Sequence, residues 1–157
     1  MLEPEQCAAL RGADITDIEN PFFLVGLLSE FNNRFQTRGD AFFEEISWRQ
    51  CFLLICMNLL GEPPTIRQLA DLSGSSHQNV KQLLLRLEKA GFVELKPDTE
   101  DRRKMRIFKT EKAREFEKAH DQPSAAFMQQ LFAGVSPEAL ETTIKTILQL
   151  DQNLENL

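Results

Sequence analysis

The 157-residue chain lacks the features that mark several classes of protein. It contains no tyrosine, only three cysteines with no Cys-x-x-Cys pair, and only two histidines, His77 and His120. An odd number of scattered cysteines predicts neither a disulfide framework nor a zinc ribbon. Two histidines so far apart in sequence also argue against a histidine-rich metal site. We therefore expect neither a metal ion nor a cofactor.

Long apolar runs are missing as well. The longest, residues 51–60, is interrupted by Asn58 and is far shorter than the ~18 residues that cross a bilayer. Glu3, Glu5 and Asp14 stand where a signal peptide would be basic and then apolar. No Gly-rich phosphate loop, nucleophile elbow or metal-spaced cluster is present. The sequence thus predicts a soluble, cytoplasmic protein that is not an enzyme.

Positive charge is scarce overall but concentrated in the middle of the chain. The formal net charge is −6, which taken alone argues against a nucleic-acid partner. Residues 65–109 nevertheless hold ten Lys and Arg against six Asp and Glu, a net charge of +4, which leaves −10 for the remainder. A basic centre between acidic flanks is typical of a DNA-binding module on a soluble scaffold.

The same central segment has the order of elements of a winged helix-turn-helix. A short helix over 65–72 begins with a Thr-x-x-Gln capping box, and Ser73-Gly74 follows as a turn. A longer helix spans 76–90, and two strand-like runs follow it, Phe92 to Lys96 and Lys104 to Lys109. Because such a ribbon is only marginally stable alone, it must lie on the helices around it. The fold class is therefore mostly α with a two-stranded β-wing.

The longer helix is polar at its start and apolar at its end, as a helix that enters a major groove must be. Its apolar residues lie at i, i+3, i+4 and i+7 and should pack on the preceding helix: Val80, Leu83, Leu84 and Leu87. Amide side chains can form bidentate hydrogen bonds to adenine, so we predict base readout by Gln78, Asn79 and Gln82. Phosphate contacts are expected from the polar residues at the helix start and beside it, Ser75, Ser76, His77 and Lys81.

An ordinary amphipathic helix with a solvated polar face would show a similar pattern. Three features favour DNA instead. No acidic residue occurs from Gly74 to Leu87, the preceding helix and turn have helix-turn-helix spacing, and a basic ribbon follows directly. At the ribbon tip, Arg102 and Arg103 are placed to enter a minor groove, whose negative potential attracts arginine. The residues expected to fold the tip or extend the phosphate contacts are Asp98, Asp101, Lys104 and Arg106.

The flanking segments are predicted to be helical. Asn20-Pro21 suits the start of one helix, which is expected to end at Arg38-Gly39-Asp40. A short aromatic segment, 41–46, leads to a helix capped by Ser47 that stops at Gly61. Beyond the wing, a helix from Thr110-Glu111 should break or kink at Pro123 and continue to about Phe132. The last helix should begin at Ser136-Pro137-Glu138.

Apolar residues at three- and four-residue steps in the first and last of these helices suit contact with another helix. The residues expected at a dimer interface are Leu24, Leu28, Phe31, Leu140, Ile144, Ile147, Leu150 and Leu154. Eight of the thirteen aromatic residues also precede residue 53. Such a cluster either forms core and interface or lines an apolar ligand pocket, for which the candidates are Phe31, Phe35, Trp48 and Phe52.

Three runs of this sequence resemble the MarR family of bacterial transcription regulators. They are Thr65 to Ala70, Leu87 to Val93, and the wing run Asp98 to Arg103 with the Thr110-Glu111-Lys112 that follows. The resemblance implies one domain over 1–157, with a winged helix-turn-helix at 47–118 and dimerisation helices at 20–38 and 123–157. It also implies a homodimer that binds a pseudo-palindromic operator in double-stranded DNA and releases it on meeting small ligands or oxidants. Lys109 and Ala113 depart from the family pattern, which usually has an apolar residue and Gly there.

The candidate signals for such a regulator are an oxidant and a small ligand. Cys51 and Cys56 lie among Phe, Leu, Ile and Met, which favours inert core cysteines over redox sensors. Cys7 has only Arg11 nearby to lower its pKa, and peroxide-sensing relatives often use tyrosines, which are absent. A repressor released by a small aromatic or apolar effector is the favoured hypothesis. The alternatives are a redox-sensing regulator and a protein-docking or non-specific DNA-binding module without a regulatory ligand.

Overall fold

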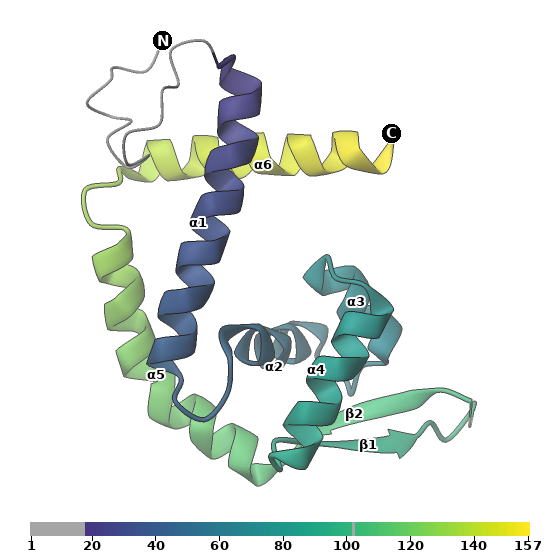
Figure 1. Ribbon diagram of the computed structural model, residues 1–157. Helices are drawn as coiled ribbons and strands as arrows, with labels where there is room; N and C mark the ends of the chain where they lie inside the picture. Colours follow the sequence, from purple (N-terminus) through teal and green to yellow (C-terminus); the bar gives the residue numbers. More distant parts are fainter. Residues whose placement is uncertain (1–17, 102) are drawn as a thin grey trace. The chain divides into compact units, whose positions relative to one another are not determined.

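The computed structural model describes residues 18–101 and 103–157, so Cys7 and Arg102 lie outside the described residues. The chain divides into two compact units, one up to Ala113 and one from Arg114 to Leu157. The described residues form helices and a single two-stranded antiparallel sheet (Figure 1). The predicted fold class, mostly α with a β-wing, is thereby confirmed.

The first unit contains the helix-turn-helix and the ribbon. Its helices are α1 (Asn20–Phe42), α2 (Trp48–Leu60), α3 (Ile66–Ser73) and α4 (His77–Lys89). The strands β1 (Val93–Pro97) and β2 (Met105–Lys109) pair antiparallel, with Val93 opposite Lys109 and Pro97 opposite Met105. The ribbon extends beyond the end of α4 (Figure 1). The α5 helix (Glu111–Leu131) begins directly after it.

Short-range signals fix the helix boundaries in this unit. The hydroxyls of Ser47 and Thr65 accept hydrogen bonds from the backbone N–H of the residue three positions on, and the Gln side chain there accepts from the cap residue's N–H. These are complete capping boxes, as the sequence predicts for Thr65. Gly74 ends α3 in the left-handed conformation, with φ 62° and ψ 28°, which only glycine adopts without strain.

The core of this unit lies where α2, α3, α4 and the ribbon meet. The residues predicted to pack inward from the longer helix do so, with Val80, Leu84 and Leu87 fully buried and Leu83 half-buried. They are joined by fully buried apolar residues of the other elements: Leu53, Leu54, Leu69, Phe92, Val93 and Ile107. This shared core fixes the position of α4 relative to the ribbon.

The predicted end of the first helix at residues 38–40 is wrong, because α1 continues to Phe42. Gly39 does not break the helix but allows α1 to approach α2. A Cβ atom at Gly39 would lie 2.8 Å from Cβ of Trp48, closer than two carbons can approach. Asp40 Oδ1 accepts a hydrogen bond from the Trp48 N–H at 2.6 Å, so the end of α1 also helps to cap α2.

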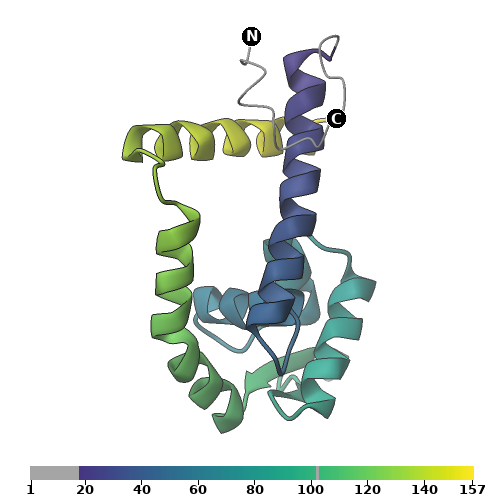
Figure 2. The ribbon, with the colours of Figure 1, turned by 60° about the vertical axis from the view of Figure 1, so that its left-hand side comes forward.

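The second unit contains most of α5 and the helix α6 (Pro137–Glu155). Ser136 caps α6 through a hydrogen bond from the N–H of Ala139 at 3.2 Å, as its sequence predicts. The views in Figures 1 and 2 both show α6 turning away from the direction of α5. No residue of α6 is buried, although seven apolar residues between Leu140 and Leu157 are exposed.

At Pro123, where the sequence predicts a break or a kink, the helix is not broken, because α5 runs through this residue. A proline in a helix removes one hydrogen-bond donor, but its fixed φ is itself helical. The remaining hydrogen bonds on either side are sufficient to keep α5 continuous here.

The two departures from the MarR pattern are both accommodated in the first unit. Lys109 donates a hydrogen bond from Nζ to Asn58 Oδ1, so the polar residue that interrupts the apolar run of α2 meets the unusual lysine of β2. Ala113 is completely buried. Neither departure therefore disturbs the packing around the end of the wing.

Candidate nucleic-acid interface

The exposed face of α4 carries the polar residues predicted to meet DNA. Gln78, Lys81 and Gln82 are all exposed, while Val80, Leu84 and Leu87 anchor the opposite face in the core. At about 100° per residue, Gln78 and Gln82 lie some 40° apart and share one side of the helix. Two amide side chains and one ammonium group are therefore presented together.

Sequence reasoning missed one residue on this face, Leu85, which is 43% exposed. Its position lies between those of Gln78 and Lys81 around the helix axis. An exposed apolar side chain among amides suits contact with the methyl group of thymine. The signal was present in the sequence, because three consecutive leucines, residues 83–85, cannot all face the core of one helix.

Asn79 occupies a different side of α4 from the two glutamines. Its side chain is half-buried, and its Nδ2 donates a hydrogen bond to Ser75 Oγ at 2.8 Å. Its backbone N–H donates to Ser76 Oγ at 3.2 Å, which caps the helix. Ser75 is itself held by a hydrogen bond from its N–H to the carbonyl of Ala70 at 3.1 Å. The structure thus brings Gln78 and Gln82 together and turns Asn79 away from them.

The remaining phosphate candidates lie at the start of α4. Ser76 and His77 are exposed at the N-cap and the first helical position, and Ser75 is half-buried in the turn before them. The free N–H groups of a helix start favour a negatively charged partner. Together with Lys81, these residues form a continuous polar edge without a carboxylate.

The wing tip is organised around the carboxylate of Asp98. Its Oδ1 accepts hydrogen bonds from the N–H groups of Glu100 and Asp101, both at 2.8 Å. Its Oδ2 accepts from Arg106 Nε, and Arg106 Nη1 donates to the carbonyl of Pro63 at 3.0 Å. Because Pro63 lies in the loop between α2 and α3, Arg106 ties the wing tip to the helical core.

These contacts keep Asp98 ionised although its side chain is buried. The N–H of Asp101, then the Arg106 side chain and the N–H of Glu100, lower the pKa of Asp98 to about 2. Each donor stabilises the charged carboxylate more than the neutral acid. At neutral pH the Asp98 carboxylate is therefore charged and can hold the N–H groups of Glu100 and Asp101 and the side chain of Arg106.

Arg103 is the tip arginine that the structure describes, and its side chain is 92% exposed. Its Nε donates to Asp101 Oδ1 at 3.1 Å, and this contact is the main cause that lowers the pKa of Asp101. Lys104 lies 3.6 Å from the same carboxylate. Asp101 thus orients the tip cations and leaves the guanidinium of Arg103 open to solvent.

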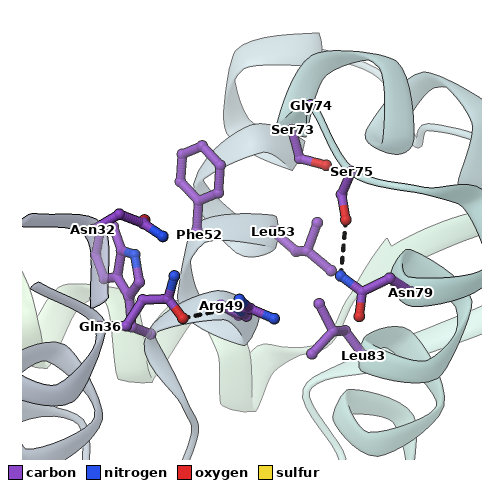
Figure 3. Close-up of a pocket in the computed structure, with 11 residues that line it drawn as sticks. Asn32, Gln36, Arg49, Phe52, Leu53, Ser73, Gly74, Ser75, Asn79 and Leu83 are labelled. Carbon is purple, nitrogen blue, oxygen red and sulfur yellow. Dashed lines mark hydrogen bonds between the residues drawn. The ribbon is translucent and has the colours of Figure 1, made fainter. Parts of the chain in front are cut away.

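A groove of about 320 Å³ lies on the side of α4 that carries Asn79 (Figure 3). Its residues come from α1, the start of α2, the turn between α3 and α4, and α4 itself. Arg49 enters it from α2 and is oriented by a hydrogen bond from its Nε to Gln36 Oε1 at 2.9 Å. Sequence reasoning did not select Arg49, because nothing near it in the chain connects it with residues 73–79.

The aromatic residues proposed for a ligand pocket form a continuous row across α1 and α2. The ring centroids of Phe31 and Phe35 are 5.9 Å apart, those of Phe35 and Trp48 are 4.7 Å apart, and those of Trp48 and Phe52 are 6.0 Å apart. Only Trp48 and Phe52 line the groove. The row is thus partly packing between helices and partly a groove wall.

The cysteines of α2 are free thiols. Cys51 and Cys56 are both buried, and burial raises the pKa of the Cys56 thiol, which disfavours the reactive thiolate. Over residues 18–101 and 103–157, no three His, Cys, Asp or Glu side chains are arranged to hold a metal ion. Nor does that part of the chain contain a helix with the length and apolar character of a membrane span.

The class of protein defined by these features is the winged helix-turn-helix. Residues 52–104 match the model of the MarR family, which agrees with the resemblance seen in the sequence. The winged segment is therefore similar to the MarR family, and the chain has the same fold as solved structures of that family. A comparison with the curated proteins found no match.

Solved structures show the same fold over most of the chain. A MarR protein from Peptoclostridium difficile is 20% identical, with a TM-score of 0.75 over 93% of this chain and 96% of that one. The Staphylococcus aureus MepR–DNA complex is 20% identical, with a TM-score of 0.74 over 87% and 99%. The organohalide-sensing regulator RdhR with bound 2,4-dichlorophenol is 19% identical, with a TM-score of 0.79 over 91% and 86%.

Proposed function

We propose that the protein is a sequence-specific, double-stranded DNA-binding transcription regulator that acts as a homodimer. The observation that carries the proposal is the exposed face of α4, where Gln78, Lys81 and Gln82 project together beside a wing with an exposed arginine. The similar fold of MepR, which was solved as a DNA complex, also supports DNA binding.

In this proposal, Gln78 and Gln82 bind base edges in a major groove while Lys81 and the start of α4 bind phosphates. The wing carries Arg102 and Arg103 toward the neighbouring minor groove. A winged helix used for protein docking would instead expose apolar or acidic residues on α4. Leu85 is an exposed apolar residue of that face, and one such residue is compatible with contact to thymine.

Self-association is supported by apolar surface on both α1 and α6. Phe22 and Phe31 are nine positions apart, which places these two exposed side chains on opposite sides of α1 at about 100° per residue. A helix with apolar residues on opposite sides needs cover on both. In α6 the exposed apolar residues other than Leu148 recur at three- and four-residue steps, the spacing of a seam with another helix.

Selection of bound sequences from a random duplex library tests the proposal, at about 150 mM salt to screen non-specific phosphate binding. We expect an inverted repeat with half-sites about one helical turn apart. Absence of enrichment by a folded, dimeric protein would contradict sequence-specific binding and favour a protein-docking or non-specific role.

The roles of Gln78 and Lys81 are separable by single substitutions. Gln78→Ala should weaken the preference at one base pair of each half-site by about 1–3 kcal/mol, because one bidentate contact is lost. Lys81→Gln should weaken binding to every duplex and reduce the salt-dependence slope by about 0.9. Fluorescence anisotropy with the selected duplex, its single-base variants and a scrambled duplex measures both effects. Equal losses on all duplexes for Gln78→Ala would show that Gln78 does not read a base.

Control of DNA binding by a small aromatic or apolar effector is a second part of the proposal, and it would make the protein a repressor that an effector releases. It is supported by the aromatic wall that Trp48 and Phe52 give to the groove beside Asn79. RdhR, whose fold is similar, was solved with 2,4-dichlorophenol. Oxidation is a weaker alternative, because the two thiols of α2 are buried.

The effector proposal is testable because Trp48 is the only tryptophan of the chain. With 2,4-dichlorophenol as the probe, we expect a saturable change in Trp48 fluorescence and release of the selected duplex over the same concentrations. Phe52→Leu should weaken both effects, whereas Phe132→Leu in the second unit should change neither. Unchanged fluorescence and unchanged DNA binding at millimolar probe would contradict an aromatic effector at this groove.

A further inference from the structure

The groove beside α4 has polar lining residues in addition to the aromatic wall formed by Trp48 and Phe52. The polar side chains that line it are Asn32, Gln36, Arg49, Ser73, Ser75 and Asn79. Among the described residues, no carboxylate lines it. Arg49 therefore brings a positive charge to a concave surface that has no lining group of opposite charge.

Several hydrogen-bond donors in the groove remain available. Within the described residues, Arg49 uses Nε for its bond to Gln36, which leaves both terminal nitrogens of the guanidinium able to donate. Asn79 uses one N–H of its amide on Ser75, whose oxygen accepts and whose own hydrogen remains free to donate. Figure 3 shows Arg49 and the Ser75–Asn79 pair facing the same space.

These donors are also held in place before any ligand binds. Gln36 of α1 fixes the orientation of Arg49, and the hydrogen bond from the Ser75 N–H to Ala70 fixes Ser75 in the turn. Ser75 in turn fixes the amide of Asn79. Pre-oriented donors cost little conformational entropy on binding, and charge-assisted hydrogen bonds to an oxyanion are stronger than neutral ones.

We infer that this groove is an oxyanion site in which Arg49, Ser75 and Asn79 together bind the oxygens of one phosphate group. The phosphate belongs either to the DNA backbone or to a small molecule. Binding of a DNA phosphate rests on the proposed DNA-binding function, whereas binding of a small molecule does not. Asn79 is then a phosphate contact rather than a base reader, which explains why it lies on a different side of α4 from Gln78 and Gln82.

Arg49→Gln tests the DNA source, with Arg38→Gln as a control that removes an equal charge from an exposed position of α1 outside the groove. If a backbone phosphate binds here, Arg49→Gln should lower the slope of log affinity against log salt by about 0.9, and Arg38→Gln should leave it unchanged. Asn79→Ala should weaken the selected and the scrambled duplex equally. A loss confined to one base pair for Asn79→Ala would overturn the assignment.

A titration with inorganic phosphate, at constant ionic strength and without DNA, tests the small-molecule source. NMR signals of the Asn79 side-chain amide should shift saturably in the unmodified protein and in Arg38→Gln, but not in Arg49→Gln. If phosphate shifts the Asn79 amide signals, the ligand of the groove is a small molecule that carries a phosphate group. If only the salt-dependence slope of DNA binding changes in Arg49→Gln, the ligand is a phosphate of the DNA backbone. If Arg49→Gln behaves like Arg38→Gln in both experiments, the oxyanion site does not exist. A protein that binds no duplex but shows the phosphate shift would instead contradict only the DNA-binding function.

Discussion

Replacement of Leu150 and Leu154 by Glu is expected to convert the protein to monomers and to weaken operator binding by at least about a hundredfold. Both leucines are exposed on α6, and Leu154 is 68% exposed, so a charge there disturbs nothing within the second unit itself. Two carboxylates in an apolar seam between helices would be removed from water when the dimer forms, and this desolvation is costly in free energy. Loss of the dimer also removes the increase in affinity that comes from binding two half-sites with one molecule. This increase is about 10²–10⁴-fold.

Sedimentation velocity measures the oligomeric state, and anisotropy with the selected duplex measures the affinity. Gln149→Glu with Gln152→Glu is the appropriate control, because it adds the same two charges on the opposite side of α6. The control protein should remain dimeric and bind DNA. A Leu150→Glu, Leu154→Glu protein that is still dimeric would place the interface elsewhere.

Gly39→Ala is expected to destabilise the protein by about 1–3 kcal/mol, the usual cost of overpacking. The new methyl group would lie 2.8 Å from Cβ of Trp48, an atom fixed to the backbone of α2. The helices must then separate, which weakens the contacts of Trp48 with Phe35 and Phe43. Chemical denaturation followed by Trp48 fluorescence gives the free energy of unfolding and also reports on this contact directly.

Gly26→Ala is the matched control, because it lies in the same helix and no residue that the structure describes is within 4 Å of its added Cβ. Alanine is favoured over glycine inside a helix, so Gly26→Ala should stabilise the protein by about 0.5–1 kcal/mol. Both substitutions replace glycine by alanine, yet they should change the free energy of unfolding in opposite directions. A stabilising Gly39→Ala would show that α1 and α2 do not pack as closely as described.

The sequence was sufficient to predict features that depend on residues close together in the chain. The caps at Ser47, Thr65 and Ser136 involve residues three positions apart, so the pattern and its hydrogen bonds occur in the same few residues. The core side of α4 was also predictable, because helical periodicity alone places Val80, Leu84 and Leu87 together.

Reasoning from the helical pattern failed at Gly39, because glycine has two opposite uses in a helix. A glycine within a helical pattern either ends the helix or allows a neighbouring helix to approach. Only the position of Trp48 on α2 decides between them for Gly39. For Pro123 the sequence left a break and a kink as alternatives, and the structure excludes the break, because α5 continues through this residue.

The sequence by itself determined the winged helix-turn-helix, its basic centre and the polar face of α4, because periodicity, capping and charge act over a few residues. Only the tertiary structure decided that Asn79 faces Arg49 rather than the side of Gln78, and that Arg106 joins Asp98 to the loop at Pro63. These groups lie 30 and 43 positions apart in the chain. Their meeting depends on how helices pack around a common core, which no local pattern specifies.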